Sequence, residues 1–144
     1  MSAQTYFEDV EVGSSLPTLE KMPTTQMLVM YAGASGDFYP IHYDQDLARA
    51  NGLPNVILHG ALKSAFLGQL LTDWIGEGGA LLKLSVQYRG MDEPGKALRC
   101  EGVVTSKRVE DGRCLVECDI WTENAEGEKT TPGSALVELP SQAA

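Results

Sequence analysis

The 144-residue chain has few basic side chains: 11 Lys and Arg stand against 20 Asp and Glu, for a formal net charge of −9. Nucleic-acid binding depends on basic residues that neutralise phosphates, so this composition argues against that function. It also argues against docking on an anionic membrane surface. A phosphate-bearing ligand would therefore need a local group of basic residues.

Cysteine is scarce as well, with three residues and no C-x-x-C pair. Cys114 and Cys118 fall in one expected strand, about 13 Å apart at about 3.3 Å per residue. A disulfide needs Cα atoms within about 7 Å, so these two cannot be bridged within that strand. We expect reduced thiols and a cytoplasmic protein.

Long apolar runs are missing too. The N-terminal stretch has no basic flank followed by an apolar segment, and we expect no targeting sequence. The most apolar later stretch, 56–75, is interrupted by polar residues such as His59 and Lys63, so we expect no membrane span. Repeats and linker-like segments are also absent from the sequence, and the length suits one compact domain covering 1–144.

Apolar periodicity predicts helices in the first half of the chain. Thr24 is placed to cap a helix that ends at Gly36, with one apolar stripe made by Met27, Met30, Tyr31 and Ala34. These stripe residues belong to the core or line an acyl tunnel. Asp44 is placed to cap a short second helix that is closed by Gly52.

The strongest predicted helix covers 60–75. Two rows of apolar residues occupy most of its circumference, and its main solvent-facing residues are expected to be Lys63, Gln69 and Asp73. A helix this apolar is normally wrapped by other structure.

The second half of the chain alternates apolar and polar residues, which predicts strands at roughly 80–89, 97–109, 113–122 and 131–139, after a short strand near 16–22. The turns between them are of hairpin type and indicate an antiparallel meander. A sheet of this kind wrapped around one long helix is an α+β fold. Its free edges favour pairing of two copies, as a homodimer or a higher homo-oligomer.

The segment S-G-D-F-Y-P-I-H-Y-D, 35–44, carries two aspartates and one of the two histidines on what reads as an irregular loop. On composition alone Asp37 could be a turn residue and His42 an ordinary core or surface histidine. Together with L-P-N-V-I-L-H-G and Q-Y-R-G-M-D-E-P-G-K further along, the segment resembles the MaoC-like hydratase and dehydratase family. The resemblance covers roughly 7–139.

This resemblance implies the hotdog fold, in which a curved antiparallel sheet wraps a long helix. It implies (R)-specific hydration of trans-2-enoyl thioesters, carried on coenzyme A or acyl carrier protein, or the reverse dehydration. By position, Asp37 and His42 match the family's catalytic pair, and Gly60 matches the glycine whose backbone N–H contacts the thioester carbonyl. No metal or redox cofactor is implied. Tyr39 departs from the family, which commonly has Asn there.

The chemistry explains why these residue types are needed. Hydration requires a deprotonated water, a proton for the α-carbon, and stabilisation of negative charge on the thioester oxygen. Asp37 can act as the base, while the neutral imidazole of His42 orients the same water and shuttles its proton. A free N–H at a helix start, such as that of Gly60, suits the oxygen.

Other residues are weaker candidates, and each has an ordinary structural interpretation. The substrate-pocket candidates are Tyr39, Pro40, His59 and Ser64. A structural role is favoured for His59, bonding across the helix start, and a packing role for Ser64. The candidates for the phosphates of coenzyme A are Arg89, Lys96, Lys63 and Arg49, each of which could equally be one exposed charge among many.

A metal site is a further alternative, since Asp37, His42, Asp44 and His59 could in principle supply mixed oxygen and nitrogen ligands. Their spacing matches no known zinc motif, so we expect none. Two other functions stay open beside hydration. One is a non-catalytic partner subunit of a heteromeric dehydratase of the steroid side-chain type, which Tyr39 motivates. The other is a hotdog thioesterase, which ranks last because the G-D-x-x-P-I-H pattern belongs with hydration.

Overall fold

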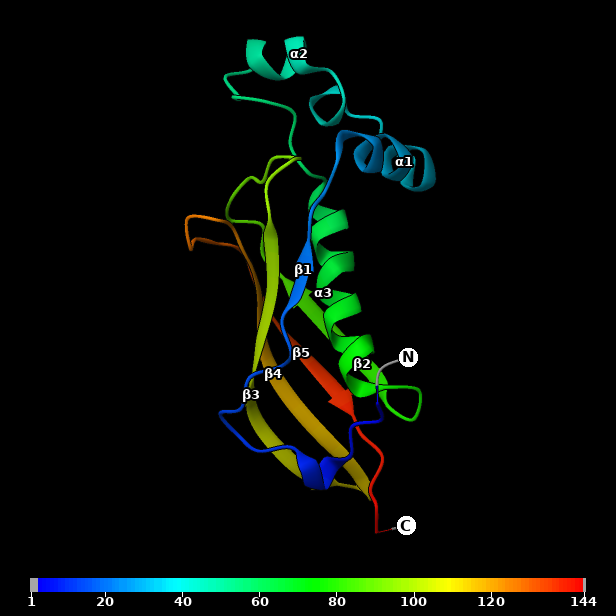
Figure 1. Cartoon of the computed structure of the whole chain (residues 1–144). Coiled ribbons are helices and arrows are strands. Elements are labelled where there is room, and N and C mark those ends of the chain that lie inside the picture. The colour runs from blue at the N-terminus through cyan, green and yellow to red at the C-terminus, as the bar shows by residue number, and fades with distance from the viewer. Residues whose placement is uncertain (1–2, 144) are drawn as a thin grey trace.

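The computed structural model describes residues 3–143 (Figure 1). Within that range, three α-helices precede most of a five-stranded sheet. The helices are α1 (Thr25–Ser35), α2 (Gln45–Ala50) and α3 (Gly60–Ile75). The strands are β1 (Leu19–Lys21), β2 (Ala80–Val86), β3 (Leu98–Glu110), β4 (Arg113–Glu123) and β5 (Lys129–Glu138), and short 3-10 turns lie at Phe7–Asp9 and Pro40–His42.

The sheet is antiparallel throughout and its strands lie in the order β1-β3-β4-β5-β2. The predicted meander is correct for β3, β4 and β5 and wrong for β2. That strand pairs with β5, with Val86 opposite Gly133, and not with β3. The segment after β2 is therefore a crossover and no hairpin turn. Alternation reveals which face of a strand is buried, but it does not identify the neighbouring strand.

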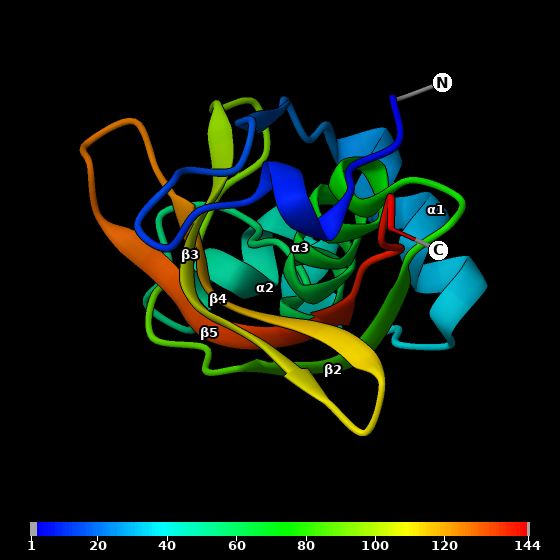
Figure 2. The same cartoon turned by 90° about the horizontal axis from the view of Figure 1, so that it is seen from below.

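Viewed from below, the sheet curves around α3 (Figure 2). The inner face of α3 is formed by side chains that are at most 6% exposed: Leu62, Phe66, Leu67, Leu70, Leu71 and Ile75. They belong to one core with residues of β3, β4 and β5, among them Val104, Val116 and Val137. Each such side chain contributes about 1.5–3 kcal/mol when buried. The predicted α+β architecture, a long helix wrapped by a curved antiparallel sheet, is confirmed.

The predicted helix ends are also confirmed. The hydroxyl of Thr24 accepts the backbone N–H of Met27 at 3.1 Å and caps α1. Gly36 ends α1 at a φ of 77°, a left-handed conformation that glycine adopts without steric cost. Asp44 accepts the N–H of Leu47 at 3.0 Å and caps α2. These caps fix the two ends of the intervening loop.

One prediction about helix faces is wrong and a second is wrong in part. Lys63 is only 2% exposed, although it was expected to face solvent. In α1 the expected core position is correct for Met27 and Tyr31, which are partly buried and pack against the core, and wrong for Met30, which is 66% exposed, and for Ala34, which is also exposed. The fully buried residues of α1 are Leu28 and Ala32. Six apolar residues in a row, 27–32, leave the periodicity of α1 unable to select a face. Lys63 is buried because it has an ion-pair partner far along the chain.

The three cysteines are free thiols, as expected. Burial raises the pKa of both Cys100 and Cys118 to about 12, because an apolar environment disfavours the thiolate. In the stretch 3–143, none of the helices combines the length and apolar character that crossing a bilayer requires.

Candidate active site

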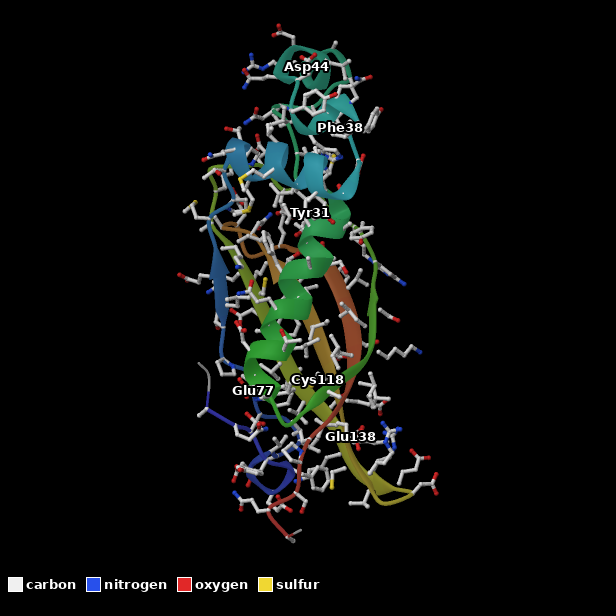
Figure 3. The ribbon with its side chains drawn as sticks, turned by 90° about the vertical axis from the view of Figure 1, so that its right-hand side faces the viewer. Tyr31, Phe38, Asp44, Glu77, Cys118 and Glu138 are labelled. Atoms are coloured by element: carbon white, nitrogen blue, oxygen red, sulfur yellow. The ribbon has the colours of Figure 1, made fainter. Side chains whose placement is uncertain are left out.

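The irregular loop between α1 and α2 lies at the end of the molecule where α3 begins. Figure 3 shows Phe38 and Asp44 at this end, with Glu77 beyond the opposite end of α3. The loop is held by its own side chains. Asp37 Oδ1 accepts the backbone N–H of Tyr39 at 3.3 Å, and the Tyr43 hydroxyl donates to the Phe38 carbonyl at 2.8 Å. Pro40 begins the 3-10 turn that leads to His42, and its fixed φ suits that position.

This loop brings together the two residues expected to form the catalytic pair. Asp37 Oδ2 lies 3.9 Å from His42 Nε2. The Asp37 side chain is 51% exposed, while that of His42 is 8% exposed. A separation of 3.9 Å is too long for a direct hydrogen bond but leaves both atoms within reach of one water molecule. The pair thus presents two acceptors toward a shared point that substrate can approach.

The hydrogen bond made by Nδ1 of His42 determines which of the two ring nitrogens carries the proton in the neutral imidazole. His42 Nδ1 lies 2.7 Å from the carbonyl oxygen of Ile57, just before α3. A carbonyl only accepts, so Nδ1 carries the proton and donates it to Ile57. The lone pair of neutral His42 is then on Nε2, which faces Asp37. The contact with Ile57 therefore fixes the tautomer that proton transfer requires.

His59 is fully buried beneath this pair. Its ring stacks on that of His42 with centroids 3.8 Å apart and planes 20° from parallel. His59 Nε2 donates to the carbonyl of Asp37 at 3.2 Å, so the structural role expected for His59 is found, although its partner is the loop and its side chain does not cap α3. Its Nδ1 is buried without a hydrogen-bond partner among the described residues. The pKa of His59 is lowered, first by burial and then by repulsion from His42, which favours the neutral ring.

His59 makes stability depend on pH. Its folded pKa lies below its unfolded value of about 6.5, so below that pH the unfolded chain binds the extra proton and the folded state loses stability. We expect the free energy of unfolding to fall by at most about 1.4 kcal/mol per pH unit from this residue as pH drops through 6.5. Urea unfolding at several pH values checks this, with His59→Gln as the comparison. Equal pH slopes for the variant and the wild type would contradict the prediction.

Asp37, His42 and His59 are also the residues of the described chain that could approach a metal ion together, with ligand atoms within 4.8 Å of one another. Asp44, the fourth candidate, is used as the cap of α2. The nitrogens of two rings stacked nearly in parallel cannot both aim their in-plane lone pairs at one ion, and tetrahedral zinc needs converging donors. The donor geometry therefore does not suit tetrahedral metal ligation by both histidines.

Gly60, the expected oxyanion donor, is the first residue of α3. The first N–H groups of a helix have no intrahelical partner, and the helix dipole adds partial positive charge there. A Cβ at Gly60 would lie 3.0 Å from the ring of Tyr88, closer than ordinary contacts allow. The packed tyrosine ring thus supplies a reason for glycine at this position, independent of any substrate.

The remaining candidates are spread around the site. Tyr39 is 57% exposed, with its ring centroid 6.3 Å from that of His42, and Ser64 is half-buried near the start of α3. Arg89 is exposed and bonds Gln87, whereas the Nζ of Lys96 pairs with Glu93 at 2.6 Å. The exposed Arg49 lies on α2. Lys63, being buried, is excluded from phosphate binding at the surface.

Two interactions that hold the site residues in place were not predicted from the sequence. One is the Ile57 carbonyl, which leaves no trace in residue type because any residue has one. The other is a buried ion pair between Lys63 and Asp92, at 3.0 Å, on α3 and the crossover after β2. A lysine on an otherwise apolar helix was a usable signal, but its partner lies 29 residues away.

Comparison with known proteins is consistent with this geometry. A family model described as "MaoC like domain" matches residues 9–124. An (R)-specific enoyl-CoA hydratase of Rhodospirillum rubrum is 27% identical over 142 residues, covering 95% of this chain and 93% of that protein. The 3-oxo-4,17-pregnadiene-20-carboxyl-CoA hydratase beta subunit of Mycobacterium tuberculosis is 29% identical over 132 residues, covering 89% of this chain and 94% of that one.

A much larger protein matches over a small part of its length. The chain is 30% identical over 112 residues to a fatty acid synthase beta subunit of Dothistroma septosporum, covering 76% of this chain and 6% of that subunit. Among solved structures, the (R)-hydratase from A. caviae involved in PHA biosynthesis superposes with a TM-score of 0.84 at 25% identity, covering 92% of this chain and 99% of that one. The curved sheet around α3 is thus the hotdog arrangement of such hydratases.

Proposed function

The chain belongs to the MaoC-like dehydratase family, and from this premise we propose that it is a hydro-lyase that adds water to trans-2-enoyl thioesters, or removes it from (R)-3-hydroxyacyl thioesters. One observation carries the proposal: Asp37 Oδ2 and the free nitrogen of His42, Nε2, lie 3.9 Å apart, and the Asp37 side chain is half exposed. Two acceptors so placed can hold both hydrogens of one water molecule and leave its lone pair free for the β-carbon.

The reaction then balances through these two residues. As the water oxygen bonds to the β-carbon, Asp37 takes one water proton. The electron pair of the double bond moves toward the thioester carbonyl, forming an enolate. His42 orients the water through Nε2. It then relays the proton that Asp37 took from the water to the α-carbon, and this transfer restores the thioester carbonyl and the Asp37 carboxylate. Dehydration is the same sequence reversed.

Gly60 supplies the third requirement under this proposal. Its backbone N–H stabilises the negative charge that develops on the thioester oxygen, since a fixed donor at a helix N-terminus needs no reorganisation during the reaction. No metal or redox group takes part in the proposed steps.

Coenzyme A or acyl carrier protein is the proposed carrier of the acyl group. Arg89 lines an open depression of about 520 Å³ formed by residues of β2, β5 and the segment after β2, and we propose it as the phosphate partner. Lys96 is less suitable because its ammonium group is already paired with the Glu93 carboxylate at 2.6 Å. Both assignments stay proposals.

The direct test is to incubate the purified chain with crotonyl-CoA. Loss of the enoyl-thioester absorbance measures hydration, and chiral analysis identifies the configuration of the product. Formation of (R)-3-hydroxybutyryl-CoA supports the proposal. Release of free thiol in a trapping assay would instead indicate the thioesterase alternative. Lack of turnover across short, long and steroid-type enoyl thioesters would contradict hydration by this chain alone.

Tyr39 is expected to influence which acyl group is accepted. Its ring stands beside His42 and is more than half exposed, so it borders the site without touching the reacting atoms. We expect Tyr39→Asn to change the ratio of kcat/KM between a bulky and a short enoyl-CoA by about 10-fold, because contacts in an acyl pocket discriminate on this scale. Phe38→Ala, also at an exposed aromatic, is the matched comparison. An unchanged ratio in Tyr39→Asn would remove Tyr39 from the specificity determinants.

A partner subunit is the second candidate function, because the similar Mycobacterium tuberculosis protein is named as a subunit. Among residues 3–143, strand β2 pairs with β5 alone and no strand lies along its other edge, which favours association with a second copy or a related chain. Turnover by the purified chain alone would exclude a purely non-catalytic role. Light scattering on the same sample distinguishes a dimer from a monomer.

A further inference from the structure

A buried polar network surrounds Lys63, which lies near the start of α3. Lys63 Nζ donates to Asp92 Oδ2 at 3.0 Å and to the Gly90 carbonyl at 2.9 Å. The Thr130 hydroxyl donates to the same Asp92 oxygen at 2.6 Å. Lys63 and Asp92 are 2% and 7% exposed, so the pair is removed from solvent. The network joins α3, the crossover after β2 and the start of β5.

A short series of contacts connects this network to the catalytic histidine. The backbone carbonyl of Asp92 accepts the N–H of Leu58 at 2.8 Å. The residue before Leu58 is Ile57, and its carbonyl accepts the hydrogen bond from His42 Nδ1. Ile57 also donates its own N–H to Ile41, the neighbour of His42, at 3.1 Å. The position of Asp92 therefore sets where the Ile57 carbonyl points.

The same network also holds the residues on the other side of Gly60. Lys63 binds the carbonyl of Gly90, two residues after the Tyr88 ring that packs on Gly60. Gly90 in turn donates its N–H to Thr130 at 2.9 Å. One buried cation thus ties together the carbonyl that orients His42 and the aromatic ring over the proposed oxyanion donor.

We propose that Lys63 and Asp92 are positioning residues, which hold the segment before α3 so that the Ile57 carbonyl keeps His42 in the tautomer with its proton on Nδ1. The hydration role of His42 rests on the proposed function, whereas the tautomer control does not. Neither residue touches the water or the substrate. A hydrophobic pair could fill the same space, but it would not anchor the Gly90 carbonyl.

The test uses the double variant Lys63→Met/Asp92→Asn, which removes both charges together and keeps an acceptor for Thr130. Two-bond ¹H–¹⁵N spectra of the imidazoles report the tautomer, and they are simple because the chain has only two histidines. We expect the fraction of His42 with its proton on Nε2 to rise several-fold in the folded variant. We also expect kcat to fall about 10-fold with little change in KM, because misplacement of a catalytic group acts on the chemical step.

The matched control is Arg113→Met/Glu138→Gln, which removes an exposed ion pair of 2.6 Å at the far end of β4 and β5. Its His42 spectrum and its kcat should match those of the wild type. A folded Lys63→Met/Asp92→Asn protein with the wild-type tautomer overturns the proposal, whatever its kcat. A tautomer shift in a chain that hydrates no enoyl thioester would support the positioning role and refute the proposed function separately.

Discussion

Asp37→Asn is expected to lower kcat for enoyl-thioester hydration by about 10³-fold, which is within the range that general acid–base groups supply. The variant keeps the size of the side chain and an oxygen that can accept the Tyr39 N–H, so the loop should hold its shape. It loses the negative charge that draws a proton from water. Initial rates with crotonyl-CoA, together with circular dichroism and melting temperature, separate lost chemistry from lost structure.

Asp44→Asn is the matched control, since it also neutralises a carboxylate seven residues further on. Asp44 caps α2, and Asn is an equally good N-cap, so rate and stability should be nearly unchanged. If Asp37→Asn hydrates at the wild-type rate, the assignment of Asp37 is wrong.

His42→Ala tests whether the two residues act on one water. Each single change should cost a similar factor, and Asp37→Asn/His42→Ala should be little worse than either alone, because groups that act as a unit are strongly non-additive. Rate losses that multiply would show that Asp37 and His42 work independently. The geometry of 3.9 Å between their side chains would then need another explanation.

The fold could be predicted where local rules decide it. Thr24, Gly36 and Asp44 mark helix ends, because capping and left-handed φ depend on residue type. The bounds of α3 followed from its two apolar rows and the glycines beside them. Strand order did not follow, because pairing of β2 with β5 is a property of the closed sheet and is not encoded in either strand's alternation.

The candidate site also has parts that could be predicted from the sequence and parts that could not. Asp37, His42 and Gly60 could be found because the chemistry requires a titratable pair and a free N–H, and the resemblance placed them. The role of Ile57 could not be found, since it acts through a backbone carbonyl that any residue has. For His59 a structural role was predicted, but its partner, the carbonyl of Asp37, was not. Lys63 was assigned to solvent because its buried partner lies on a segment that is distant in sequence.

Lys63→Met is expected to produce the largest loss of stability among the predicted variants. It leaves Asp92 buried at 7% exposure without its cation, and removing one partner of a buried pair costs about 3–5 kcal/mol. Proteins of this size have a total free energy of unfolding of only about 5–15 kcal/mol. We expect the melting temperature to fall by on the order of 10 °C. Differential scanning calorimetry and urea unfolding measure both quantities.

The cause can be isolated by removing the second charge. Lys63→Met/Asp92→Asn should recover most of the loss, because the penalty comes from an uncompensated buried carboxylate and not from a missing attraction. Lys96→Met breaks the exposed Lys96–Glu93 pair, whose lysine is 58% exposed, and should leave the melting temperature nearly unchanged, because water screens a surface ion pair. If Lys63→Met melts like Lys96→Met, then Asp92 has found solvent or a proton, and the rigidity assigned to the segment before α3 must come from the Leu58 and Ile57 backbone bonds instead.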